Sequence, residues 1–473
     1  MIHKNRTEYD LLGGMKIPKS AYYGIQTLRA KQNFYISGIE LSNYPKLIIA
    51  LAQVKKACAL ANNELGLLDD KMTYAICAAC DEIFLKKYHD QFIVDPIQGG
   101  AGTSTNMNAN EVITNIALEI LGHKKGKYSI IHPNNHVNMS QSTNDVYPTA
   151  VRLALYEHLC KLENTMGILR DAFLLKAKEF DHVIKMGRTQ LQDAVPMTLG
   201  QEFKAFAIMV GEDVEILEIA KKLVAQMNLG GTAIGTGINS DADYASLVKE
   251  KLQEVTNRPF ETACDLVEAT QDTSTFVHVS GVLKSIVTKV SKICNDLRLL
   301  SSGPRTGFNE INLPKMQPGS SIMPGKVNPV IPEVVNQVAF QVIGNDVTIS
   351  MASEGGQLQL NVFEPVIAFN LFQSIFMMCN AFETLAYKCI IGITANEERC
   401  QEMALNSIGL VTALNPYIGY QNATSIAKEA LESNESVYDI VLKRGLLSKE
   451  QLDEYLKPEN MTHPNRTNKC NTI

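Results

Sequence analysis

The sequence predicts an all-α protein in which three domains are arranged around a central bundle of long helices. From about Leu266 to Ser302, apolar residues recur at alternating steps of three and four with no internal proline. This spacing predicts one long helix with a single apolar stripe, and Gly303-Pro304 is its expected end. The stripe consists of Val279, Leu283, Ile286, Val290, Ile293, Leu297 and Leu300.

Helical periodicity extends over much of the remaining central sequence, whereas alternating strand patterns are scarce. A helix of 30 residues is about 45 Å long, at ~1.5 Å per residue, and outgrows a compact monomer. We therefore expect these helices to pack against one another and against other subunits in an oligomeric bundle. The long periodic segments lie near residues 149–180, 199–228, 330–352 and 364–394. In the second segment, the residues expected to share one helix face are Ile216, Ile219, Leu223 and Met227.

Changes in composition and in the length of the helical segments along the chain predict three domains. Residues 1–145 contain shorter helical segments, polar loops and more glycine and asparagine, and residues 146–395 contain the bundle. Residues 396–473 form a small C-terminal helical domain. Within it, Ser448 and Gln451 have the spacing of a capping box that opens a short helix, just after Arg444-Gly445 ends the preceding one.

Composition and charge exclude several classes of protein. The 473 residues are 45% hydrophobic and 20% charged, as in a folded globular protein. A formal net charge of −6 lacks the basic surplus of a nucleic-acid-binding surface. The first ten residues are polar, which predicts no secretory signal, and no apolar stretch is expected to reach the ~20 residues of a membrane span. We expect a cytoplasmic enzyme without nucleic-acid or membrane partners.

The ten cysteines are scattered, and only Cys77 and Cys80 fall close together. A CxxC pair can be a redox motif or half of a zinc site. This pair lies in an apolar helical run with no second pair nearby. Because a free cysteine packs as a small hydrophobic residue, we interpret both as buried structural residues in a reducing compartment.

Two polar segments precede predicted helices and carry more hydrogen-bonding groups than a connection requires. In Gly99–Asn106, glycines and threonines come before a helix, where backbone N–H groups form a ready anion site. An ordinary capped turn explains that pattern equally well. In Asn138–Asp145, six side chains are hydroxyls or amides, although one such residue suffices to cap a helix. Such groups bind a carboxylate without presenting a repelling charge.

Two further polar segments lie in the central region. In Gly187–Asp193, Arg188 can bind a carboxylate or can pair structurally with Asp193. The connection from Gly303 to about Val330 is long and polar and contains Gly319–Pro329, with two serines, a lysine and an asparagine. Connections of this length are often functional loops, and these residues suit a base with a carboxylate clamp. A plain surface loop is the alternative.

A second glycine cluster, Gly230–Gly237, has the composition of a phosphate-binding loop. No strand of a dinucleotide-binding fold precedes it, and its surroundings are helical. We interpret it as a tight turn between helices.

The segment GSSIMPGKVNP at Gly319–Pro329 resembles the signature of the fumarase/aspartase superfamily, whose members form fumarate by anti elimination. Three further motifs resemble that family in the same order, and the likeness runs nearly end to end. They are GTSTNMNANEV, HPNNHVNMSQSTNDVYPTA and KMGRTQLQDAVPMTLGQEF. The ends of the likeness are DLLGG with YYGIQTLRA near the N-terminus and NSIGLVTALNP near the C-terminus.

Within the superfamily, the chain resembles the aspartase branch. Fumarases have a histidine directly after the threonine of the GRT motif, where this chain has Gln190, as do enterobacterial aspartases. Some aspartases keep the histidine, so Gln190 argues against a fumarase more than for an aspartase. YYGIQTLRA and the segment Glu268–Asp272 are also similar to aspartases. The resemblance implies reversible anti elimination of ammonia from L-aspartate to give fumarate.

The resemblance also implies roles for individual residues. Ser320 matches the base that removes the Cβ proton. The α-carboxylate positions are Thr189, Lys326 and Asn328. The β-carboxylate positions are Thr103, Ser142, Thr143 and Ser321, and the positions near the amine are Asn144 and Gln190. The family forms homotetramers in which three chains contribute to each active site, which agrees with the expected oligomeric bundle.

These residue types suit the chemistry. Removing the weakly acidic Cβ proton becomes feasible when the charge moves onto the β-carboxylate as an aci-carboxylate, which hydroxyl donors stabilise. Lys326 and backbone N–H groups in the loop would favour an ionised Ser320, and loop closure would exclude water. The chemistry needs no cofactor and no metal site is expected, although a divalent cation such as Mg²⁺ activates some aspartases.

Two alternatives remain open at this point. The first is a fumarate hydratase on the same scaffold. The second is a catalytically silent structural relative, as occurs among lens proteins of the superfamily. The second predicts loss of Ser320, Lys326 or Asn328, and all three are present.

Overall fold

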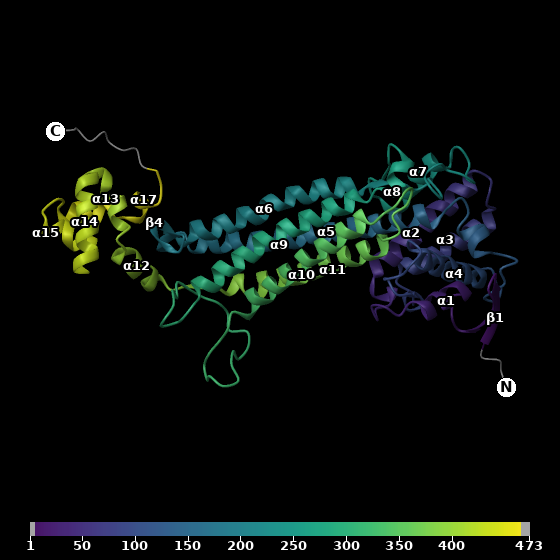
Figure 1. Ribbon diagram of the computed structural model, residues 1–473, viewed down its shortest axis with the longest axis horizontal. Helices are drawn as coiled ribbons and strands as arrows, with labels where there is room; N and C mark the ends of the chain where they lie inside the picture. Colours follow the sequence, from purple (N-terminus) through teal and green to yellow (C-terminus); the bar gives the residue numbers. More distant parts are fainter. Residues whose placement is uncertain (1–4, 465–473) are drawn as a thin grey trace. The chain divides into compact units, whose positions relative to one another are not determined.

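The structure is a computed structural model that describes residues 5–464 (Figure 1). Helices account for 62% of the chain and strands are few and short, which confirms the all-α prediction. Contacts group the described residues into two compact units. Unit 1 contains those of Met1–Glu163, Glu215–Ser285 and Phe340–Met377, and unit 2 contains those of Asn164–Val214, Ile286–Ala339 and Met378–Ile473. The division into three domains at 145 and 395 stays a prediction.

Five helices of 25 to 37 residues run through both units, in agreement with the predicted long segments. They are α5 (Thr143–Glu179), α6 (Leu199–Val224), α9 (Ser274–Leu300), α10 (Val330–Glu354) and α11 (Glu364–Lys388). The seven apolar residues predicted for the stripe of α9 are all buried, and the helix ends at Leu300, shortly before Gly303-Pro304.

Polar contacts join these helices within each unit. In unit 1, the contacts are Lys221 to Glu163 (2.7 Å), Ser280 to Asp346 (2.7 Å) and Asn345 to Ser374 (2.9 Å). In unit 2, they are Lys289 to Asp213 (2.7 Å), Asn336 to Ser291 (2.8 Å) and Thr165 to Glu383 (3.2 Å). The predicted bundle of long helices is therefore present, and buried polar pairs supplement its apolar packing.

Two details of the bundle differ from the prediction. The expected single helix from Leu266 is interrupted, because α8 (Leu266–Gln271) ends at Asp272, whose backbone is extended. The Asp272 carboxylate accepts the Ser274 N–H (3.2 Å) and so caps α9 instead of continuing α8. In α6, Ile219 and Leu223 are 60% and 41% exposed, and Met227 does not share their helix face, because it lies beyond the helix in β5 (Gln226–Met227), where it is buried.

Shorter helices complete unit 1. They are α1 (Ile25–Asn33), α2 (Pro45–Glu64), α3 (Asp70–Phe84), α4 (Thr103–Ile120), α7 (Tyr244–Thr256) and α8, with a π-helical turn η3 (Pro133–Val137) and two 3-10 turns, η1 (Leu41–Asn43) and η2 (His89–Gln91). Strands β1 (Asn5–Asp10) and β2 (Gly13–Pro18) form an antiparallel hairpin, and β5 pairs in parallel with β6 (Glu261–Thr262). Helix α2 packs against α3, α4 and α7.

Two buried carboxylates cap the first turn of α1. Glu111 of α4 accepts hydrogen bonds from the backbone N–H groups of Gly24 (2.8 Å) and Thr27 (3.1 Å), among others, and Glu8 of β1 accepts that of Ile25 (2.9 Å). These bonds satisfy N–H groups that a helix leaves unpaired at its start. Burial raises the pKa of Glu111 to about 7, and the neighbouring charge of Glu8 adds to this effect.

Unit 2 contains an antiparallel hairpin of β3 (Ile184–Thr189) and β4 (Gln192–Thr198), which the sequence did not predict. Its other elements are β7 (Ile311–Asn312), β8 (Thr394–Ala395), the 3-10 turn η4 (Ile390–Gly392) and the C-terminal helices α12 (Glu397–Asn406), α13 (Leu410–Ile418), α14 (Tyr420–Ser433), α15 (Val437–Lys443), α16 (Lys449–Tyr455) and α17 (Pro458–Met461). The predicted capping box of Ser448 and Gln451 opens α16. Helices α12, α13 and α17 contact the hairpin.

Two sequence expectations about burial have different outcomes. Cys80 is buried and Cys77 partly buried, both thiols are free, and burial raises the pKa of each, as expected for structural cysteines. By contrast, one helical stretch, Glu364–Gly392, is long and apolar enough to meet a length-and-composition criterion for a membrane span, contrary to the expectation. Because 67% of its most apolar window is buried in the protein, it also matches a core helix.

Candidate active site

The start of α4 holds the first predicted site residue. Gly102 is the N-cap residue and adopts a φ of 91°, a conformation that glycine tolerates and other residues rarely adopt. Thr103 follows as an exposed residue whose hydroxyl donates to the carbonyl oxygen of Gly100 (2.7 Å). One turn later, Asn106 is buried and points its amide toward the start of α5, where it donates to Thr143 Oγ1 (3.1 Å).

The start of α5 holds three predicted residues in successive positions. Ser142 Oγ accepts the backbone N–H of Asn144 (3.2 Å), and Thr143 Oγ1 accepts the Asn106 amide. A hydroxyl that accepts such a bond keeps its own proton for donation elsewhere. The Asn144 side chain donates to the carbonyl oxygen of Ala233 (2.7 Å), so the glycine-rich turn fixes its orientation.

Asp145 anchors this segment to the glycine cluster. One of its carboxylate oxygens accepts the N–H of Ser142 (2.9 Å), and the other accepts those of Gly230 (3.2 Å) and Thr232 (2.9 Å). Gly230 has a φ of 96°, and a Cβ atom there would lie 2.7 Å from Ala245. The cluster is thus a tight turn, as predicted, and it also serves as the support of Asn144 and Asp145.

A buried lysine lies behind the same segment. Lys55 of α2 is fully buried and donates to Asn138 Oδ1 (2.9 Å) and Gln141 Oε1 (2.8 Å). The sequence analysis did not single out Lys55, although a signal was present. With Leu51, Cys58 and Asn62 it forms a stripe at steps of four, three and four, and all four residues are buried. A lysine within such a stripe indicates a specific buried partner.

Thr189 and Gln190 lie at the tip of the β3–β4 hairpin, and both are exposed. Gln190 and Leu191 form the two-residue turn with φ values of 55° and 62°. Positive φ at both central residues is the geometry of a type I′ turn, which glycine or asparagine usually occupies. A glutamine and a leucine in this conformation are strained, and such strain is characteristic of functional sites.

The base of the hairpin carries a buried ion-pair network. Arg188 Nη1 lies 2.6 Å from Glu310 Oε1, and Lys185 Nζ lies 2.7 Å from Glu310 Oε2. Glu310 is completely buried, and the Arg188 guanidinium also stacks over the Phe308 ring. The proposed structural partner of Arg188, Asp193, is therefore wrong: Asp193 accepts instead from Ser407 Oγ (2.7 Å). Arg188 is a structural residue and supports Thr189 and Gln190.

The loop between β7 and α10 presents the predicted base. Ser320 Oγ accepts the backbone N–H groups of Ile322 (3.2 Å) and Met323 (2.9 Å). The Asn328 amide donates to the carbonyl oxygen of Gly319 (2.6 Å), and Gly319 N–H donates to that of Lys326 (2.9 Å). These bonds close the loop upon itself. Ser321 and Lys326 are exposed within it.

The structure thus collects the predicted residues in three places. Unit 1 brings the start of α4 together with the start of α5, and this group contains Thr103, Ser142, Thr143 and Asn144. Unit 2 carries the hairpin tip with Thr189 and Gln190, and the loop with Ser320, Ser321, Lys326 and Asn328. Among the described residues, no hydrogen bond joins the hairpin tip to the loop.

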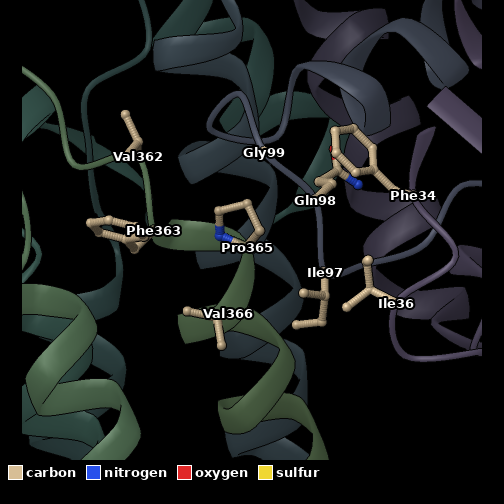
Figure 2. Close-up of a pocket in the computed structure, with 9 residues that line it drawn as sticks. All are labelled: Phe34, Ile36, Ile97, Gln98, Gly99, Val362, Phe363, Pro365 and Val366. Carbon is tan, nitrogen blue, oxygen red and sulfur yellow. The ribbon is translucent and has the colours of Figure 1, made fainter. Parts of the chain in front are cut away.

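A separate pocket of about 290 Å³ lies in unit 1, between the segment before α4 and the start of α11 (Figure 2). Its walls are mostly apolar, with Phe34, Ile97 and Phe363 among them, and none of the predicted site residues lines it. Such a wall does not suit a dicarboxylate. Residues 5–464 contain no group of three or more His, Cys, Asp and Glu side chains arranged to hold a metal ion.

Comparison with known proteins agrees with the motifs. Residues 13–344 match the family described as Lyase, and residues 410–463 match that described as Fumarase C C-terminus. The chain belongs to the fumarase/aspartase superfamily. A curated aspartate ammonia-lyase from Helicobacter pylori is 65% identical over 97% of this chain and 98% of its own length. Others from Pseudomonas fluorescens and Escherichia coli are 61% and 54% identical, with coverage of at least 96% on both sides.

Solved structures show the same likeness. A crystal structure of a fumarate lyase:delta crystallin from Brucella melitensis bound to cobalt has a TM-score of 0.95 and 54% identity, over 97% of this chain and all of that one. A recombinant class II fumarase from Schistosoma mansoni has a TM-score of 0.92 and 34% identity, over 97% and 99%. This superfamily member is a carbon–nitrogen lyase.

Proposed function

We propose that this lyase removes ammonia from L-aspartate by reversible anti elimination, with Ser320 as the base and an aci-carboxylate as the intermediate. The relatives at 54–65% identity over nearly the full chain show the aspartate ammonia-lyase function itself. The mechanism rests chiefly on one observation: two backbone N–H groups point at Ser320 Oγ. Donors aimed at an oxygen stabilise negative charge on it. A serine in this setting can act as a base after ionisation.

The first step moves the Cβ proton of aspartate to the ionised Ser320 Oγ. The electron pair of the C–H bond passes onto the β-carboxylate, whose two oxygens then carry a full negative charge each. The hydroxyls of Ser142 and Thr143 support this step, because each oxygen accepts an N–H bond and keeps its proton to donate. We assign Thr103 and Ser321 to the same pocket as further donors. One donor of this kind typically contributes about 10²–10³ in rate.

In the second step, the electron pair returns to form the carbon–carbon double bond, and the ammonium group leaves as ammonia with the pair of the C–N bond. We assign Thr189, Lys326 and Asn328 to the α-carboxylate, because they offer one cation and two neutral donors. Asn144 and Gln190 are assigned to the amine. The strained turn at Gln190 supports a functional role for the hairpin tip.

We further propose a homotetramer in which three chains contribute to each active site. Large apolar side chains are exposed on the long helices of unit 1. Among the most exposed are Phe340 (65%), Val347 (57%) and Met351 (69%) on α10, Phe376 (60%) on α11 and Ile219 (60%) on α6. The three on α10 recur at steps of seven and four and so share one face of the helix, and an exposed apolar face of this kind indicates packing against another protein surface. Assembly from several chains explains why site residues are divided between two units of one chain.

The compartment and cofactors are also proposals. We place the enzyme in the cytoplasm with L-aspartate and fumarate as its small-molecule partners, and without nucleic-acid or membrane partners. The cysteines among the described residues are all free, which suits a reducing compartment. The elimination requires no cofactor, and Mg²⁺ is a candidate activator only.

Product analysis tests the substrate. The purified protein is incubated with fumarate and ammonium and, separately, with fumarate alone. Aspartate is expected in the first reaction and no malate in the second. Malate without aspartate would assign a fumarate hydratase instead, and no product from either reaction would indicate a silent relative.

Substitution tests the base. Ser320→Ala should lower kcat by about 10²–10⁴ through loss of the proton transfer. Secondary structure and oligomeric state should not change, because within residues 5–464 the only other bonds of this hydroxyl are to two N–H groups within the exposed loop. Ser433→Ala, at an exposed serine of α14 whose hydroxyl donates to the backbone carbonyl oxygen of Glu429, is the matched control and should retain activity. Retained turnover in Ser320→Ala would reassign the base, with Ser321 as the next serine to replace.

A further inference from the structure

Lys55 is a buried cation that none of the steps above uses. Burying an ammonium group is costly unless it gains a charged partner. Its Nζ instead donates to two neutral amide oxygens, of Asn138 and Gln141, and among the described residues no carboxylate lies within ion-pair distance. Burial accordingly lowers the pKa of Lys55 to about 7. A protein that only needed to fasten Asn138 would do so at less cost with a neutral donor.

A chain of hydrogen bonds leads from Lys55 to Thr143. Asn138 Oδ1 accepts Lys55 Nζ and also the amide of Asn106 (3.1 Å). The same Asn106 amide donates to Thr143 Oγ1 (3.1 Å). Asn110 donates to Asn138 Oδ1 as well (3.1 Å), so three donors fix the position of that oxygen. The cation is therefore linked through two buried amides to the hydroxyl that we assign to the β-carboxylate.

The surroundings of Lys55 leave its charge largely unneutralised. The titratable groups that face it are Cys58 on its own helix, Cys80 of α3, Asp145 of α5 and, beside Cys58, Tyr244 of α7. Burial raises the pKa of Cys58 to about 12 and that of the other two neutral groups well above their usual values, so all three stay uncharged. Burial raises the pKa of Asp145 to about 6, and three backbone N–H groups already share the charge of its carboxylate.

We propose that Lys55 is a positioning residue for the elimination, which fixes Asn138 and through it the Asn106 amide against Thr143, and which supplies positive potential beneath the β-carboxylate pocket. This inference rests on the proposed function, because it takes Thr143 as a donor to the β-carboxylate. Positive potential stabilises the aci-carboxylate more than the carboxylate, since the charge on those oxygens doubles in the intermediate. In a site of low dielectric, such a fixed charge acts over more than one hydrogen bond.

The closing experiment uses two changes that remove the charge in different ways. Lys55→Met keeps an unbranched apolar stem up to the ε position but removes the cation. Asn138→Asp keeps Lys55 in place and puts a carboxylate against its Nζ, so that the pair is neutral. A purely structural role predicts that Asn138→Asp costs no more than the bond from the Asn138 amide to the carbonyl oxygen of Gln141 (3.2 Å), since the buried lysine then gains a partner. A role through its charge predicts that both variants lose activity.

Two probes separate the charge effect from general damage to the site. The ionised form of 3-nitropropionate carries a full negative charge on each nitronate oxygen, as the aci-carboxylate does, whereas succinate carries an ordinary carboxylate. Both variants should bind the nitronate about 10- to 100-fold more weakly, with a similar loss in kcat, and succinate less than about 3-fold more weakly. Asn135→Asp adds the same charge at an exposed position of η3 and is expected to match the wild type in both affinities.

The second measurement is the uptake of protons when a dianion binds. Because the pKa of Lys55 is about 7 in the free protein, a dianion that binds at pH 8 should raise it and take up a proton. Calorimetry of succinate binding in two buffers of different ionisation enthalpy should detect this uptake in the wild type but not in Lys55→Met. If Lys55→Met does not fold, Asn138→Asp alone decides the matter, since it retains the bonds of Lys55.

Three outcomes would overturn the proposal: equal losses for the nitronate and succinate, unchanged kcat in Asn138→Asp, or no proton uptake in the wild type. Thr143→Val, measured in parallel, distinguishes failure of the inference from failure of the proposed function. If Thr143→Val loses activity while Lys55→Met and Asn138→Asp retain it, the assignment of Thr143 to the β-carboxylate pocket is supported and the role of Lys55 is rejected. If Thr143→Val also retains activity, the assignment of the pocket is wrong, and the proposal for Lys55 is wrong with it.

Discussion

Gly102 allows a direct test of how closely the starts of α4 and α5 must approach. A Cβ atom at this position would lie 2.5–2.7 Å from three ring atoms of Tyr147, and Tyr147 is only 2% exposed. A buried ring cannot move aside without displacing its neighbours. Gly102→Ala should therefore cost about 1–3 kcal/mol for the overlap, in addition to about 1–2 kcal/mol for an alanine at a φ of 91°.

Gly122, just after the other end of α4, supplies the matched control. Its φ is 77°, and a Cβ atom there would have no neighbour within 4 Å. Gly122→Ala thus carries only the conformational cost, about 1–2 kcal/mol. The difference between the two variants isolates the contact with Tyr147, about 1–3 kcal/mol.

Urea unfolding monitored by circular dichroism measures both variants against the wild type, and kcat/KM for aspartate is measured below the transition. Gly102→Ala should be the less stable variant and should also lose activity, because displacing the start of α4 moves Thr103 and the Asn106 amide away from Thr143. Gly122→Ala should retain kcat/KM. Equal loss of stability in the two variants, or full activity in Gly102→Ala, would refute the reasoning.

Three further predictions concern stability. Glu310→Gln should destabilise the protein by about 3–5 kcal/mol in urea unfolding, since Lys185 and Arg188 lose a fully buried counter-charge; a loss below 1 kcal/mol would contradict this. Burial raises the pKa of the Glu111 carboxyl to about 7 in the folded protein, from an ordinary value of 4.5. The stability gained from the protonated carboxyl is therefore complete below pH 4.5 and is lost as pH rises through 7. The stability of the wild type should thus fall by up to about 3 kcal/mol relative to Glu111→Gln between pH 4.5 and 7, and parallel curves would exclude this effect. Ser448→Ala should lower stability by about 1 kcal/mol through loss of the capping box of α16, whereas an unchanged melting temperature would show that this helix does not contribute.

The regular parts of the fold followed from local patterns. The alternating apolar steps of three and four predicted the buried stripe of α9, and Gly303-Pro304 marked its end, because both depend only on residues within one helix. The capping box at Ser448 is local in the same sense. The break at Asp272 was missed, since an aspartate within a helical pattern can either point to solvent or cap the next helix.

Contacts between residues that are distant in the sequence could not be predicted from local patterns. Arg188 pairs with Glu310, 122 residues further along the chain, although Asp193 lies opposite it in the hairpin and was the nearer candidate. The exposed apolar residues Ile219 and Leu223 of α6 show a related limit of prediction from sequence patterns. The apolar spacing at Ile219 predicts a contact, but spacing alone does not say whether the contact is made within the chain or with another subunit.

By itself, the sequence determined the all-helical class, the superfamily and the identity of the candidate site residues, because helix periods and an eleven-residue signature are properties of contiguous residues. The tertiary structure decided what surrounds those residues. It showed that Thr143 accepts the Asn106 amide and that a buried lysine, Lys55, lies behind them. Those facts depend on burial and on contacts across many residues, which determine the strength of a charge or a hydrogen bond and which no local pattern specifies.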